Sequence, residues 1–126
     1  MTTRKEWSMT EREAILGLMM GERMKASLIA ATQMAMVIEG LAEHEKAGAD
    51  RVFSTFLRAL YQDIGLAHKV FPQEEWAEIR RELDNGLVMV DSNVSHAAMD
   101  NLARAISRAT TVSNRAMTFL NDKGLL

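Results

Sequence analysis

Three histidines, His44, His68 and His96, are the side chains of this sequence best suited to bind a metal ion or to transfer a proton near neutral pH. A helical protein builds a metal site when such residues face one another from different helices. Di-iron helical sites use Glu-x-x-His steps, and zinc proteases use His-Glu-x-x-His, but neither spacing occurs here. The chain also has no cysteine, which removes thiolate ligands and thiol nucleophiles. We therefore expect no metal site.

Sequence patterns for covalent catalysis and for phosphate binding are absent as well. There is no Gly-x-Ser-x-Gly nucleophile motif, no Gly-x-Gly-x-x-Gly and no Gly-x-x-x-x-Gly-Lys. The paired carboxylates Glu74/Glu75 and Glu78/Glu82 fall on the exposed side of a predicted acidic helix. We expect a non-enzymatic protein without a cofactor, acting as a scaffold, adaptor or regulatory subunit.

The C-terminal segment suggests a different chemistry, contact with DNA. Residues 100–124 resemble the helix-turn-helix of winged-helix regulators, with Leu102-Ala103-Arg104-Ala105-Ile106 before a turn at 107–111 and Val112-Ser113-Asn114-Arg115-Ala116 after it. Residues 92–126 carry four basic and two acidic side chains, so the segment is locally positive. The resemblance implies base contacts by Ser113, Asn114 and Arg115, and phosphate contacts by Arg104, Arg108 and Lys123. The apolar period also continues through 107–111, so a turn and an unbroken helix both remain open.

Composition favours one all-helical domain over the whole chain. The 126 residues are 48% hydrophobic and 6% aromatic, with a single proline, which is ample for a core and poor in strand and turn signals. We expect an all-α antiparallel bundle with two long and two shorter helices. The net charge of −2 calls for neither nucleic acid nor an anionic membrane. The lack of cysteine fits a reducing cytoplasm.

Helix caps and apolar periodicity set the expected boundaries. Ser8 and Glu11 form a capping box, Gly48 is the first plausible stop, and Asp50 is a suitable N-cap for the next helix. Pro72 suits the first turn of a short acidic helix that ends at Asn85-Gly86. The expected helices are 8–47, 50–70, 72–85 and 87–121, with possible breaks at 17–21 in the first and at 91–93 or 107–111 in the last.

No segment is long and apolar enough to cross a bilayer. The most apolar stretch, Ala26–Ile38, supplies 13 residues between Lys25 and Glu39, whereas a transmembrane helix needs roughly 20. The N-terminus lacks the apolar region of a secretory signal. We expect a cytoplasmic protein without membrane contact.

The first helix predicts self-association. Its polar residues between 22 and 43 gather mainly in one narrow stripe, Lys25, Thr32, Glu39 and Glu43, and most of the remaining surface is apolar. The other helices of so small a chain can hardly cover a helix that is apolar nearly all round. We therefore expect a homodimer, with a further protein as a possible partner. The expected interface consists of Met19, Met20, Met24, Leu28, Met34 and Val37.

Overall fold

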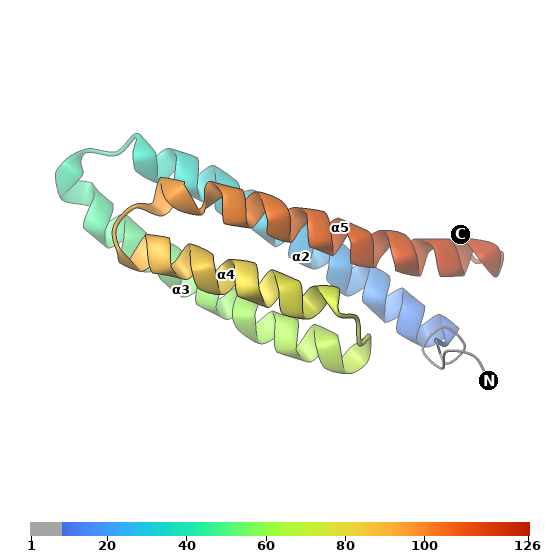
Figure 1. Ribbon diagram of the computed structural model, residues 1–126. Coiled ribbons are helices and arrows are strands. Elements are labelled where there is room, and N and C mark those ends of the chain that lie inside the picture. Colours follow the sequence, from blue (N-terminus) through green and yellow to red (C-terminus); the bar gives the residue numbers. More distant parts are fainter. Residues whose placement is uncertain (1–8) are drawn as a thin grey trace.

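The computed structural model describes residues 9–126, which form an antiparallel four-helix bundle (Figure 1). Its helices are α2 (Glu11–Glu39), α3 (Glu43–Val70), α4 (Glu75–Asp91) and α5 (Met99–Asp122), with a short 3₁₀ helix η1 (Ser95–Ala98) before α5. Successive helices run in opposite directions, and α5 closes the bundle by packing along α2 (Figure 1). The all-α bundle expected from the sequence is confirmed.

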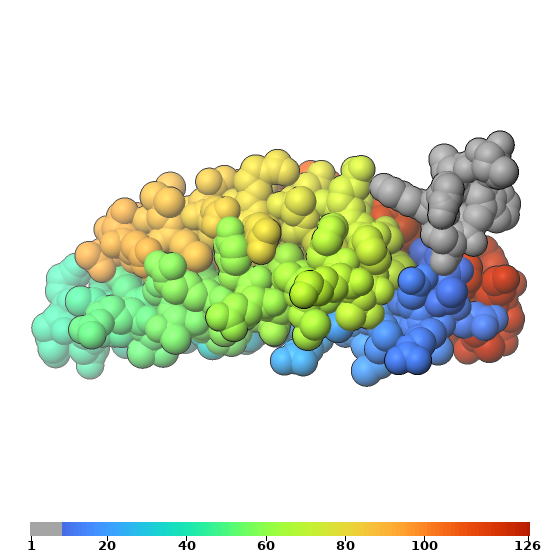
Figure 2. Space-filling model, turned by 90° about the horizontal axis from the view of Figure 1, so that it is seen from below, coloured from blue at the N-terminus to red at the C-terminus, as the bar shows by residue number. Residues whose placement is uncertain are grey.

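The first and last helices, α2 and α5, reach beyond α3 and α4 at one end of the bundle (Figure 1). Figure 2 shows α3 and α4 on the near face, with the start of α2 and the end of α5 extending past the connection between them. The core lies between the four helices, and Trp76, Phe53 and Phe71 are its largest buried side chains. The indole N–H of Trp76 donates to the carbonyl of Phe71 at 2.9 Å, so this buried donor is satisfied.

The first helix is shorter at both ends than its sequence predicts. It begins at Glu11 with Thr10 as N-cap, and the Glu13 N–H donates to the Thr10 hydroxyl at 3.0 Å while Glu13 accepts from the Thr10 N–H at 2.9 Å. This capping box lies two residues beyond the one expected at Ser8, which falls outside the described residues. The helix is continuous through 17–21 and ends at Glu39 rather than at 47.

The chain turns at residues 40–42, and the polar cluster that follows opens α3 instead of closing α2. Glu43 and Glu45 lie in the first turn of α3, where carboxylates interact favourably with the helix dipole. Glu45 also accepts a hydrogen bond from the Ala42 N–H at 3.2 Å. The sequence analysis assigned these residues to the end of the first helix because it took Gly48 as the first stop signal of that helix.

Asp50, expected as an N-cap, lies inside α3 and is buried. Its carboxylate accepts a hydrogen bond from the Ser95 hydroxyl at the start of η1. Nearby, Asp91 at the end of α4 accepts from Ser54 at 3.0 Å and from Arg58 at 2.7 Å. These contacts attach the α4–η1 connection to α3, a tertiary role that local sequence does not reveal.

The last two helices also have different limits from those expected. α4 begins three residues after Pro72 and continues through Asn85-Gly86 to Asp91, and Gly86 is buried inside the helix. The break expected as one option near 91–93 is present, with Asn93 in the left-handed region at φ 66°. The helix α5 is unbroken over Met99–Asp122.

Among residues 9–126, no helix combines the length and the apolarity that crossing a membrane requires.

Two glycines let α2 lie close to its neighbours. A Cβ at Gly17 would stand 2.4 Å from the Phe71 ring, and a Cβ at Gly21 would stand 2.5 Å from the Ser113 hydroxyl and 3.2 Å from its backbone nitrogen. Alanines continue this face further along α2, where Ala31 and Ala35 are buried. The side of α2 that faces the bundle therefore combines small residues, which allow close helix packing, with the larger buried side chains of Met24, Leu28 and Ile38.

We predict that Gly17→Ala destabilises the fold while Gly65→Ala does not. The new methyl group at residue 17 collides with a buried ring, which should cost about 1–3 kcal/mol of unfolding free energy. Gly65 in α3 has open space around it, so alanine there should stabilise the helix by up to about 1 kcal/mol. Urea denaturation measures both, and equal stability of the two variants would contradict the Gly17–Phe71 contact.

Candidate functional site

The most prominent surface feature of the bundle is a line of residues on the outward side of α2. We call it the outer seam, and it consists of residues separated alternately by four and three positions: Ile15, Met19, Glu22, Ala26, Ile29, Gln33 and Met36. All seven side chains are exposed, including Ile15 at 47%, Met19 at 62%, Ile29 at 42% and Met36 at 61%. Spacing of this kind is the heptad pattern of coiled coils, in which such a line packs against a second helix.

Apolar and charged residues border the outer seam. Val37 is 65% exposed, and Leu66 of α3 lines a shallow hollow together with Met20. The Lys25 ammonium lies 3.2 Å from the Glu22 carboxylate, and Arg23 lies 3.9 Å from Asp63 of α3. The result is an apolar surface with a thin charged border, which is typical of sites that bind another protein.

The structure divides the six predicted interface residues into three pairs, one exposed, one half-buried and one buried. Met19 and Val37 are exposed, and Met20 and Met34 are half-buried against the core. Met24 and Leu28, at 3% and 0% exposure, belong to the chain's own core and offer no surface to a partner. The sequence analysis included them because it did not separate the inner side of the helix, which α3 and α5 cover, from its outer side.

Four apolar residues of the outer seam were missed from the sequence, Ile15, Ala26, Ile29 and Met36, as were its two polar residues, Glu22 and Gln33. Their signal was available, since they share the alternating spacing of four and three with Met19. A second apolar line, which includes Met24, Leu28 and Ala35, runs along the opposite side of the same helix. Sequence alone does not tell which line faces the core.

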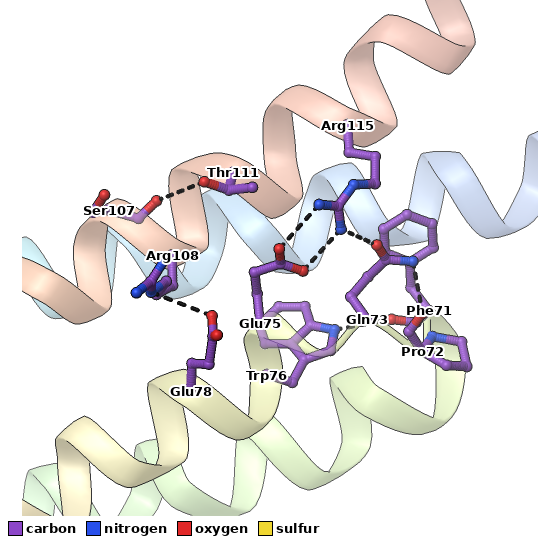
Figure 3. Close-up of polar contacts among 10 residues, drawn as sticks. All are labelled: Phe71, Pro72, Gln73, Glu75, Trp76, Glu78, Ser107, Arg108, Thr111 and Arg115. Atoms are coloured by element: carbon purple, nitrogen blue, oxygen red, sulfur yellow. Dashed lines mark hydrogen bonds and ion pairs between the residues drawn. The ribbon is translucent and has the colours of Figure 1, made fainter. Parts of the chain in front are cut away.

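The arginines expected to contact DNA form ion pairs with α4 (Figure 3). Both terminal nitrogens of Arg115 bind the Glu75 carboxylate, at 2.8 and 2.9 Å, and Arg115 also donates to the Gln73 side chain. Arg108 lies 3.2 Å from Glu78, and outside the view Arg104 lies 3.0 Å from Glu82. These three pairs join the exposed sides of α4 and α5.

Of the two options left open for residues 107–111, the structure has the unbroken helix, so the turn of a helix-turn-helix is absent there. Residues 107–111 lie within α5, where the Thr110 and Thr111 hydroxyls donate to the carbonyls four residues earlier, at 2.9 and 3.1 Å. Ser113 is buried against Gly21 and cannot reach a base edge. Asn114 is exposed, and the ammonium of exposed Lys123 lies 5.5 Å from the centre of the Phe119 ring.

The three histidines do not come together with other ligands. His44, His68 and His96 are each exposed, and within residues 9–126 no three His, Asp or Glu side chains are grouped as a metal site would require. His68 lines a hollow of about 400 Å³ at the end of the bundle together with Glu13, Phe71 and Glu74. The Glu13 carboxylate there already caps α2.

Comparisons with protein-family models, with curated proteins and with solved structures find no match to this chain. The outer seam therefore has to be interpreted from its own chemistry.

The Glu75–Arg115 pair makes stability depend on pH. Hydrogen bonds from Arg115 lower the pKa of Glu75 below its ordinary value of 4.5. Because the folded state favours the charged carboxylate, the pair stabilises the fold above pH 4.5 and its contribution disappears as the pH falls through the lowered pKa.

We predict that Glu75→Gln costs about 1 kcal/mol or less of unfolding free energy at pH 7, since the pair is partly exposed. The variant should lose less stability than the original chain between pH 6 and pH 3 in urea titrations. Gln73→Ala, which retains the ion pair, is the control and should keep the original pH dependence. Parallel pH curves for the original chain and Glu75→Gln would contradict the assigned role.

Proposed function

We propose that this chain is a non-enzymatic interaction protein that assembles with a second copy of itself through the outer seam of α2. The observation that carries the proposal is the exposed heptad line from Ile15 to Met36. At 1.5 Å per residue the line is about 32 Å long, which corresponds to about three heptads. Withdrawing its apolar side chains from water supplies the driving force for association.

A second copy is a suitable partner because it brings a helix of the same length and the same spacing. The inner side of α2 is occupied by its own bundle, so only the outer seam is free for this purpose. Residues flanking the seam include small Ala30 and half-buried Leu16, which would let the two helices approach closely. A two-fold dimer would leave the α4 surface free for a further protein, consistent with a scaffold or adaptor.

We favour self-association over contact with DNA. Arg104 and Arg108 are two of the three cations expected at phosphates, Arg115 is the cation expected at a base, and each of these arginines is paired with a glutamate of α4. Binding a nucleic acid would require breaking these pairs and placing the glutamates close to phosphates, which like-charge repulsion opposes.

We predict that the chain is a dimer at micromolar concentration and that Ile29→Lys combined with Met36→Lys makes it a monomer. Two charges on each copy would meet apolar surface, so the Kd for dimerisation should rise at least about a hundredfold. Sedimentation equilibrium measures the change. Both positions are exposed in the single chain, so far-UV circular dichroism should remain unchanged.

The matched control is Val88→Lys, which changes a similarly exposed apolar residue on α4, away from α2. This variant should dimerise like the original chain. A monomeric original chain at all soluble concentrations, or a Val88→Lys variant as impaired as the double variant, would refute the proposed assembly.

A further inference from the structure

We infer that the two copies pair antiparallel through the outer seam, in the one register that places Glu22 of each copy opposite Gln33 of the other. This inference rests on the proposed self-association and adds the orientation and register of the partner helix. It follows from the order of polar, small and large residues along the seam.

The seam carries two polar residues, Glu22 and Gln33, among five apolar ones. A buried polar side chain without a hydrogen-bond partner is costly, so the favoured pairing must bring partners to both. Between Met19 and Met36 the seam reads Met, Glu, Ala, Ile, Gln, Met. In the reverse direction it reads Met, Gln, Ile, Ala, Glu, Met, so its two ends complement each other.

In the antiparallel register, every position of this segment meets a suitable partner. Met19 of one copy faces Met36 of the second, and small Ala26 faces larger Ile29, which keeps the two helices evenly spaced. The Gln33 amide can donate to the Glu22 carboxylate of the second copy, and the two-fold axis makes this contact twice. Beside the seam, Leu16 meets Val37 of the second copy, which accounts for the exposure of Val37.

Other arrangements leave these polar groups poorly matched. A parallel dimer in register places Glu22 against Glu22, and like charges in the seam of a coiled coil repel. An antiparallel dimer shifted by one heptad places Glu22 against Ala26 and Gln33 against Ile15, so that Gln33 faces an apolar side chain and Glu22 is left with Lys25 of its own chain. The Lys25 ammonium lies 3.2 Å from Glu22 of its own chain and, more than two helical turns from Gln33, is not a partner for that amide.

Cysteine cross-linking tests the orientation, because the chain has no cysteine of its own. In the inferred register Met19→Cys of one copy faces Met36→Cys of the other, so a double variant should oxidise to a covalent dimer. Each single variant should not, since residues 19 and 36 are about 25 Å apart along one helix and a disulfide joins Cα atoms no more than about 7 Å apart. Both positions are more than half exposed, so the fold should tolerate the changes.

The outcomes separate the orientation from the assembly itself. Covalent dimers from both single variants would show a parallel pair, which overturns the inferred register and retains the dimer. A dimer by sedimentation that none of the variants cross-links would overturn the inferred register, and the Ile29→Lys and Met36→Lys double variant would then show whether the outer seam is still the interface. A monomer by sedimentation would overturn the proposed function together with this inference.

A charge introduced at Gln33 tests the register independently of cross-linking. Gln33→Lys places an ammonium opposite Glu22 of the second copy, so the Kd should fall about threefold at low salt, and the gain should diminish in high salt. In a parallel pair the same change sets lysine against lysine, and the Kd would rise instead. Gln62→Lys, on the exposed side of α3, is the control and should leave the Kd unchanged.

Discussion

Close packing of the inner side of α2 is the constraint on which the rest of the structure depends. Gly17 and Gly21 leave no room for a Cβ against Phe71 and Ser113, and buried alanines extend the same side. The longer apolar side chains of α2 are divided between this inner side, where Met24 and Leu28 are buried, and the outer side, where Ile29 and Met36 are exposed. The close contact inside the bundle and the exposed seam outside it are therefore two consequences of one helix sequence.

The packing of α4 against α5 brings basic side chains of one helix beside acidic side chains of the other. The C-terminal helix is locally basic and α4 is acidic, and the three arginine–glutamate pairs join them side by side. Hydrogen bonds from Arg115 lower the pKa of Glu75, so this carboxylate stays charged to a lower pH than an isolated glutamate. Local positive charge in a sequence is thus weak evidence for a nucleic-acid surface until its neighbours in space are known.

The all-helical fold class could be predicted from the sequence because apolar periodicity and turn signals act over a few residues. The residues at which each helix begins and ends could be predicted less well. Glu43 and Glu45 stabilise the start of α3 through their position relative to its dipole. The sequence alone does not show that the preceding helix has already ended at Glu39. Asp50 has the chemistry of an N-cap, but its partner Ser95 lies 45 residues away in the chain. Residues 107–111 remained open between helix and turn because their apolar period continued while their similarity to a DNA-binding motif suggested a break.

The sequence by itself determined an all-helical bundle, an apolar excess in its first helix and the absence of motifs for catalysis. Those properties follow from residue type and spacing, which act over a few positions. Only the tertiary structure decided which of two apolar lines on α2 is core and which is exposed, since that depends on where α3 and α5 pack. It placed Met24 and Leu28 inside the bundle and left Ile29 and Met36 exposed.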